Sequence, residues 1–185
     1  MKTRKLLNVL PECYVDTNLI EYLLDAGVNH QHSCSKVVGQ LNTTFADSFA
    51  VGIIDKDKVE LGYVRECEVI AKTEHLTLLR HSTRPQYLVM VAPAIDGFIL
   101  DCARKEGVDP QAYGIPSDLK AFTKESKSVT SNTDPRFKSL FAALSDNGEI
   151  SALRSTLRYL SDSKYSTDSS VLKQLFTPTP SGPSR

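Results

Sequence analysis

The pattern of apolar and polar positions changes its period along the chain, and it predicts strands and helices in turn. The clearest strand covers residues 48–54, an apolar run without polar alternation that stops at Asp55. A strand of this kind is covered on both faces, which is typical of parallel sheets. The pattern therefore places a buried strand in the first third of the chain, with an acid at its end.

Further elements are predicted upstream of this strand. A short β-prone run over residues 12–15 ends at Asp16, and an apolar helical face follows over residues 17–27. A short extended segment comes next, and a second helix covers residues 35–42. The order strand, helix, strand, helix, strand predicts a layered α/β fold.

The chain changes character after its first hundred residues. Two more strands are predicted over residues 76–82 and 87–93, and a helix over 94–107, whereas residues 58–75 are ambiguous. Helix-like segments separated by Ser, Asp, Asn and Pro follow. The predicted organisation is a leader over residues 1–11, an α/β core over 12–107, a helical C-terminal subdomain over 108–176 and a disordered tail over 177–185.

Two acids are predicted to lie at the same edge of the sheet. Asp16 and Asp55 each end a parallel strand, and in open α/β sheets ligands bind at the carboxyl ends of the strands. Asp57 follows one residue after Asp55, and Mg²⁺ prefers carboxylate oxygens as ligands. The structural alternatives are a solvated turn for Asp55 and Asp57 and a helix N-cap for Asp16.

Over about residues 12–105, the chain resembles the topoisomerase–primase (TOPRIM) domain. The resemblance is carried by CYVD, a helix, HSCSKVVGQL, a strand and IIDKD, in this order. In that family the first strand ends in an acid, usually Glu, and a later strand ends in Asp-x-Asp. The resemblance implies a Rossmann-like core with a mainly parallel sheet. This chain differs from the family in having Asp16 as the first acid and Thr17 where Gly is usual.

The resemblance also implies a nuclease that cleaves phosphodiester bonds with Mg²⁺ or Mn²⁺. Asp16 would be a metal ligand and the general acid or base, and Asp55 and Asp57 would be further ligands. The run VAPAIDGFILDCA is similar to a segment of small TOPRIM nucleases of the RloB and abortive-infection type, which nominates Asp96 as another ligand. Such nucleases often work with an ATPase partner, which suggests an effector of antiviral defence.

The predicted second helix adds features suited to a phosphate group. Lys36 lies near its start and is nominated as a catalytic residue that steadies the phosphate, with Lys56 and Lys58 as alternatives. Backbone N–H groups around Ser35 would also attract an anion. The structural alternative for each lysine is an ordinary surface charge.

Three other interpretations stay open. YVDTNLIEYLL also resembles the opening of a PIN-domain ribonuclease, which would again use Asp16 and Mg²⁺. His30 and His32 alternate on an extended segment and face the same side, so they can share a zinc ion. The helical second half also suits a catalytically inactive, TOPRIM-like protein whose role is to bind a partner.

The composition of the chain restricts its possible partners and cellular location less than the motifs do. The formal net charge is zero, with 22 basic and 22 acidic residues, so charge alone favours no partner. No stretch reaches the roughly 18 apolar residues of a membrane span, and the start lacks the features of a signal peptide. Four scattered cysteines without a C-x-x-C pair indicate reduced thiols. We therefore expect a cytoplasmic protein that acts on nucleic acid and has no membrane partner.

Overall fold

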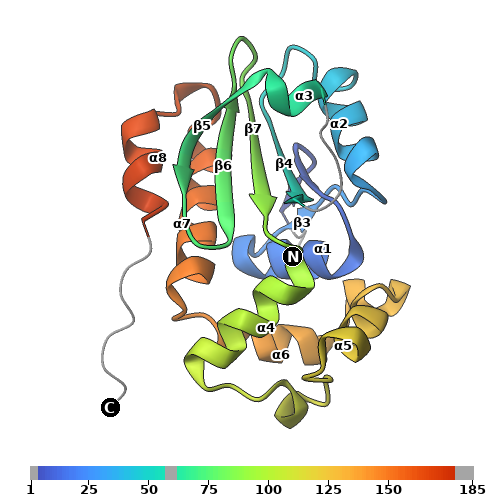
Figure 1. Ribbon diagram of the computed structural model, residues 1–185. Coiled ribbons are helices and arrows are strands. Elements are labelled where there is room, and N and C mark those ends of the chain that lie inside the picture. The colour runs from blue at the N-terminus through green and yellow to red at the C-terminus, as the bar shows by residue number, and fades with distance from the viewer. Residues whose placement is uncertain (1–3, 57–61, 178–185) are drawn as a thin grey trace.

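Strands and helices alternate through the first half of the chain, and helices fill the second half (Figure 1). The computed structural model describes residues 4–56 and 62–177. The strands are β1 Lys5–Leu6, β2 Val9–Pro11, β3 Gly27–Val28, β4 Ala50–Asp55, β5 Cys67–Lys72, β6 Leu76–His81 and β7 Gln86–Val91. The α-helices are α1 Tyr14–Leu24, α2 Cys34–Asn42, α3 Gly62–Arg65, α4 Ile95–Glu106, α5 Leu119–Ser126, α6 Pro135–Ala143, α7 Gly148–Ser163 and α8 Ser169–Leu175. Short 3₁₀ helices are η2 Pro110–Tyr113, η3 Val129–Asn132 and η4 Lys164–Ser166.

The main sheet has five strands in the order β2-β4-β7-β6-β5. β2, β4 and β7 run parallel, whereas β6 and β5 are antiparallel to their neighbours. The α/β class is therefore confirmed, but the sheet is mixed rather than mainly parallel. The reason lies in the connections, because residues 73–75 and 82–85 are too few for anything but hairpin turns.

The described part of the segment predicted as a leader, residues 4–11, contains β1 and β2. Val9 and Leu10 are completely buried, and β2 pairs with β4 along its whole length. The strand predicted over residues 12–15 is wrong. That segment turns into the first residues of α1, and the strand lies three residues earlier in the chain.

The early start of α1 has a local cause. Its N-cap is Cys13, and the backbone N–H of Cys13 donates to Oδ2 of Asp16 over 3.1 Å. A carboxylate at the third helical position that bonds back to the N-cap closes a capping box, which fixes where a helix begins. Asp16 consequently lies inside α1 and does not end a strand.

The extended segment after α1 lies beside β2 at the edge of the sheet. β3 pairs with β1 in parallel, and two further backbone contacts continue this pairing. The N–H groups of Asn29 and Gln31 donate to the carbonyl oxygens of Val9 and Pro11 over 3.0 and 2.9 Å. The chain then enters α2, which is found where the sequence predicts it.

β4 is buried on both faces, as its unbroken apolar pattern predicts. Val51 and Ile53 belong to a large hydrophobic cluster with side chains of α1, α4, α6 and α7. Ala50 and Ile54 point to the opposite face and belong to a smaller cluster with α2 and α3. This alternation makes β4 the strand around which both layers of helices are assembled.

The helices after residue 107 share the large hydrophobic cluster with the sheet. Phe122 and Phe137 are wholly buried in the same cluster as Val51 and Ile53. Figure 1 shows α4, α5 and α6 beyond the C-terminal ends of β4 and β7. The domain boundary at residue 107 stays a prediction.

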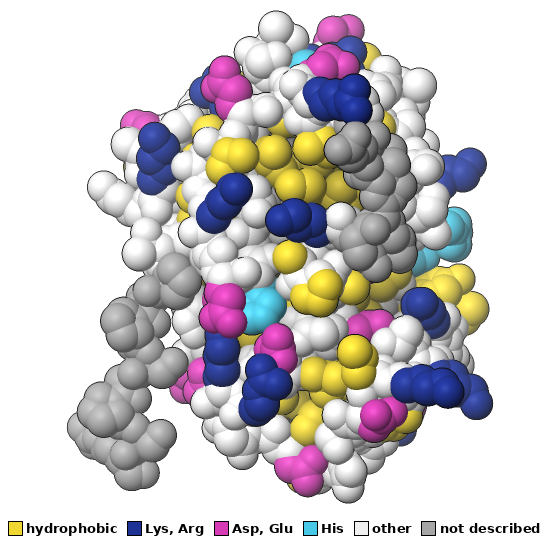
Figure 2. Space-filling model, viewed as in Figure 1, with side chains coloured by type: hydrophobic (Ala, Val, Ile, Leu, Met, Phe, Trp, Pro, Cys, Tyr) yellow, Lys and Arg dark blue, Asp and Glu magenta, His cyan; other side chains and the backbone are white. Residues whose placement is uncertain are grey.

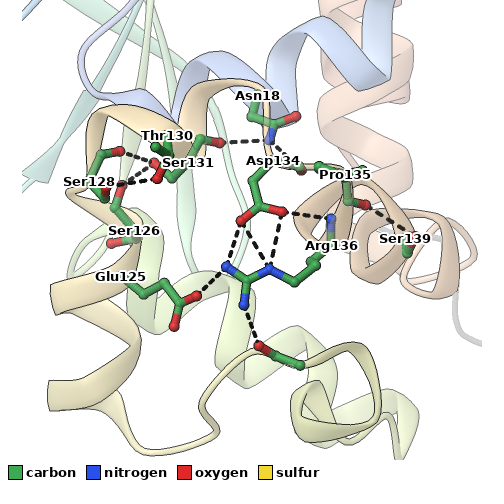
Figure 3. A network of polar contacts seen from close by, with 11 residues as sticks. Asn18, Glu125, Ser126, Ser128, Thr130, Ser131, Asp134, Pro135, Arg136 and Ser139 are labelled. Carbon is green, nitrogen blue, oxygen red and sulfur yellow. Dashed lines mark hydrogen bonds and ion pairs between the residues drawn. The ribbon is translucent and has the colours of Figure 1, made fainter.

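Polar contacts also fasten this helical part to α1 (Figure 3). Asn18 of α1 is wholly buried, and its Nδ2 donates to the backbone oxygens of Ser131 and Asp134 over 2.7 and 3.1 Å. Arg136 in turn bonds to the carboxylates of Asp134 and Glu125. α1 is therefore held by the C-terminal helices as well as by the sheet.

Figure 2 shows a patch of hydrophobic side chains over the middle strands of the sheet, below α3 in the view of Figure 1. Basic and acidic side chains are interspersed across the view in Figure 2, and neither sign forms a continuous stripe. All four cysteines are free thiols. Among the described residues, no helix has the length and apolar character that a bilayer crossing requires.

The contact between α2 and β4 provides a test of this packing. A Cβ on Gly52 would lie 2.8 Å from side-chain atoms of both Leu88 and Val37, so we expect Gly52→Ala to destabilise the fold by about 1–3 kcal/mol. Gly39, inside α2, is the matched control because a Cβ there meets no atom within 4 Å. Gly39→Ala should stabilise the protein by about 0.5–1 kcal/mol. Chemical denaturation measures both values, and equal effects of the two substitutions would contradict this packing.

Candidate functional site

Three acids lie where the parallel strands β2, β4 and β7 end. Glu12 directly follows β2, Asp55 is the last residue of β4, and Asp96 lies in the first turn of α4 after β7. These strands are neighbours in the sheet and run the same way, so their carboxyl ends meet at one edge. All three side chains are buried, with 3% of Glu12 and 7% each of Asp55 and Asp96 exposed.

Asp55 connects the three strand ends. Its backbone N–H donates to Oε2 of Glu12 over 3.0 Å, which joins β4 to β2. Its Oδ1 accepts a hydrogen bond of 2.9 Å from the N–H of Ile95, the residue before Asp96. The prediction that Asp55 ends a buried strand is therefore confirmed.

Asp16 reaches the same group of acids from inside α1. Its Oδ2 accepts the N–H of Cys13, whereas its Oδ1 is buried and has no hydrogen-bond partner. Burial and the neighbouring Asp55, with a smaller contribution from Glu12, raise the pKa of Asp16 to about 8, although the hydrogen bonds from Cys13 oppose the shift. Burial, and then Asp16, also raise the pKa of the Cys13 thiol, which stays protonated and is a poor nucleophile.

Glu12 was missed by the sequence analysis, although its signal is present in the chain. The apolar run Val9–Pro11 is a strand and ends at this acid, but its three residues were assigned to a leader. Asp57 and Lys58 lie outside the described residues. Lys36 is exposed in the first turn of α2, and only its backbone N–H takes part in hydrogen bonds, to Ser33, in the part of the chain that is described.

The side chains at this edge offer the type of ligand that a hard divalent cation prefers. Every donor is a carboxylate oxygen, and Oδ1 of Asp16 and Oδ1 of Asp96 are both buried without a hydrogen-bond partner. Buried carboxylates that lie together repel one another, and a cation removes that repulsion. The oxygens of these acids do not form a set of three within 4.8 Å of one another, so binding would require them to move closer.

A second polar cluster lies where β6 meets α4 and α7. Within the described residues, Glu74, His75 and Glu149 are the one group whose candidate ligand atoms all lie within 4.8 Å of one another. Both ring nitrogens of His75 are already bonded, Nδ1 to Glu149 over 2.9 Å and Nε2 to Asp101 over 3.0 Å. Burial lowers the pKa of His75, but these two carboxylates outweigh burial and the net shift is upward. We interpret this cluster as a structural ion-pair network.

A pocket of about 380 Å³ lies beside Glu12. The rings of Tyr14 and His30 stack in it with their centroids 4.7 Å apart, and His32 lies edge-on to both. No third zinc-type ligand joins His30 and His32 among the described residues, since the only group of three is the one around His75. The shared zinc site that the alternation of His30 and His32 made possible is therefore not formed among the described residues.

Comparison with family models, with curated proteins and with solved structures finds no match to this chain. The function is therefore inferred from the geometry of the site.

Asp16 provides a test of the electrostatics of the site. Its pKa is higher in the folded than in the unfolded protein, so folding takes up a proton between about pH 4 and pH 8, and stability falls as the pH rises through that range. Asp16→Asn should remove this dependence and melt at a higher temperature than the wild type above pH 7. Exposed Asp47→Asn is the control and should follow the wild type. Wild-type and Asp16→Asn curves that stay parallel from pH 4 to pH 8 would contradict the grouping of these acids.

The His75 network provides a separate test at higher pH. A histidine whose pKa is raised by folding contributes stability that is complete below its unfolded value near 6.5 and is lost as the pH rises through its folded value. We expect His75→Gln to lower the free energy of unfolding at pH 6 more than at pH 8.5. Urea denaturation at the two pH values measures this difference, and an equal loss at both would show that His75 is not charged in the fold.

Proposed function

We propose that this protein is a metal-dependent nuclease with a TOPRIM-like core. One observation carries the proposal: neighbouring parallel strands end in buried acids at one edge of the sheet. Burying carboxylates costs free energy unless they are neutralised or bonded, and two of the buried oxygens, on Asp16 and Asp96, have no partner. Sites that raise a carboxylate pKa in this way are concentrated where binding or catalysis occurs.

Glu12 takes the position that the family resemblance gives to the first acid. In TOPRIM domains that acid is usually Glu and ends the first strand of the core, and Glu12 directly follows β2. We therefore assign the position of the first acid to Glu12 in place of Asp16. Asp55 and Asp96 would hold Mg²⁺ or Mn²⁺ with Glu12, and Asp16 would supply a further carboxylate from α1.

When bound, such a cation supplies positive charge that stabilises the developing negative charge on a phosphoryl group. The chain itself positions the substrate. α2 begins at the same edge as the acids, because the segment before it runs parallel to β2 and passes Pro11. Its first N–H groups and the exposed Lys36 would orient a phosphate beside the carboxylates.

The substrate class follows from this arrangement of acids and phosphate-binding groups. We propose nucleic acid, without a preference for DNA or RNA, because carboxylates that hold a cation beside phosphate-binding groups suit a phosphodiester. The ATPase partner, the role in antiviral defence and the cytoplasmic location stay predictions from the resemblance and the composition.

A catalytically inactive interaction protein is the second candidate. It is favoured by the backbone hydrogen bonds that Glu12, Asp16 and Asp55 each accept, which is how acids with a structural role are commonly satisfied. The PIN-type ribonuclease is supported less, because YVDTNLIEYLL is helical throughout and contains no strand end.

Metal titration of Asp55→Asn decides between a nuclease and an inactive protein. Asn has nearly the same shape and keeps an oxygen that can accept the N–H of Ile95, so the fold should persist. Calorimetry with Mg²⁺ and Mn²⁺ should show affinity lower than wild type by about tenfold or more. Cleavage of a supercoiled plasmid and of a labelled RNA should fall in parallel.

Exposed Glu74→Gln is the matched control for this experiment. It removes one carboxylate from the His75 cluster and should leave metal binding unchanged. If Glu74→Gln loses the metal and Asp55→Asn retains it, the metal binds at the His75 cluster and not at the strand ends. A wild-type protein that binds neither cation would support the interaction protein.

A further inference from the structure

The pocket beside Glu12 contains His30, and the contacts of its ring indicate which ring nitrogen is protonated. The pocket is lined by Glu12, Cys13, Tyr14, His30, His32 and Lys127. The segment that carries His30 runs parallel to β2, so this side chain lies at the same edge of the sheet as the acids. His30 therefore belongs to the surroundings of the proposed reaction.

The hydroxyl of Thr17 lies between a backbone oxygen and the ring of His30. Its oxygen is 2.8 Å from the carbonyl oxygen of Cys13, to which it can donate, and 2.7 Å from Nδ1 of His30. A hydroxyl has one hydrogen, so a hydroxyl that donates to Cys13 accepts from Nδ1. The geometry points to Nδ1 as the protonated nitrogen, with a lone pair on Nε2.

Nε2 of His30 is buried and has no hydrogen-bond partner. Burial, followed by the neighbouring His32, lowers the pKa of His30, which keeps the ring neutral near pH 7. The other titratable groups that face this pocket are Glu12, Cys13, Tyr14, His32 and Lys127. A buried lone pair without a donor is unfavourable, and in native proteins such groups are concentrated at sites with a chemical role.

The ring of His30 is also held in position by aromatic contacts. It stacks on Tyr14 at an interplanar angle of 18°, and His32 lies edge-on beside it at 89°. His32 is itself exposed, so its side chain can turn away without unpacking the core.

We propose that His30 is the general base of the reaction, and that its Nε2 takes the proton from the water that attacks the phosphodiester. The step rests on the proposed nuclease function. The water loses one proton to Nε2 as its oxygen forms a bond to phosphorus, and the bond from phosphorus to the leaving oxygen breaks. The leaving oxygen takes a proton from solvent, and His30 returns its proton to solvent. The products are a phosphate monoester and an alcohol.

Thr17 is the positioning residue in this scheme, because it acts through His30. Thr17→Val removes the hydroxyl but keeps the side-chain shape, so Nδ1 and Nε2 can then exchange the proton. Thr17→Ser keeps the hydroxyl and should keep the tautomer.

Nitrogen-15 NMR of the histidine rings tests the tautomer without any need for activity. The wild type and Thr17→Ser should show His30 protonated on Nδ1, and Thr17→Val should show a mixture of tautomers. A wild-type His30 protonated on Nε2 would overturn the proposal, whatever the cleavage assay shows.

Single-turnover cleavage with saturating Mn²⁺ tests the role of the lone pair. His30→Gln should slow cleavage by about 10²- to 10⁴-fold, the usual contribution of a general base, while calorimetry shows unchanged Mn²⁺ affinity. Thr17→Val should slow cleavage less, and Thr17→Ser should restore it. Cleavage by a folded His30→Gln within threefold of wild type would overturn the base and leave the nuclease function standing. Absence of cleavage by the wild type would overturn the nuclease function, and the base with it.

Discussion

The candidate site depends on four carboxyl groups that lie together in the buried part of the protein. Three neighbouring strands deliver Glu12, Asp55 and Asp96 to one edge, and α1 adds Asp16 from the side. All four side chains are buried. Carboxylates in such surroundings either take up protons, accept hydrogen bonds or bind a cation. The raised pKa of Asp16 is an example of the first response, and the N–H groups that bond to Glu12 and Asp55 are examples of the second.

Backbone N–H groups offset part of the free-energy cost of burying these carboxylates. Asp55 is central, because its own N–H bonds to Glu12 while its carboxylate accepts the N–H of Ile95. These bonds tie β2, β4 and the start of α4 together, so the acids organise the strand ends as well as carrying charge. The unpartnered oxygen of Asp16 and the raised pKa of its carboxyl indicate that the compensation is incomplete. An incompletely compensated group of acids is the arrangement expected when a ligand supplies the remainder.

Much of the fold could be predicted from periodicity, because β4, β6, β7, α2 and α4 are long enough to show their period. β2 could not, since three residues ending in proline are too few for an alternating pattern. The start of α1 was missed because Cys13 is an unusual N-cap, and the capping interaction comes from an acid that looked like a strand end. These two errors had one consequence: Asp16 was placed at a strand end, whereas the acid that follows the strand is Glu12.

Only part of the candidate site could be predicted from the sequence. Asp55 could be placed because it interrupts an apolar run, whereas Asp96 was nominated by the family resemblance alone. The tautomer of His30 could not be inferred, since it depends on a threonine hydroxyl that bonds one turn back along α1 and meets the ring only in three dimensions.

The amide of Asn18 shows how closely the two halves of the chain depend on each other. A single side chain next to Thr17 spans the distance to the loop before α6 and satisfies two carbonyl oxygens there. Part of the pocket lining is thus carried by α1. Asn18 ties that helix to residues more than a hundred positions later in the chain. A substitution in that distant loop would loosen α1 without touching any acid, so variation among the C-terminal helices has a direct physical route to the candidate site.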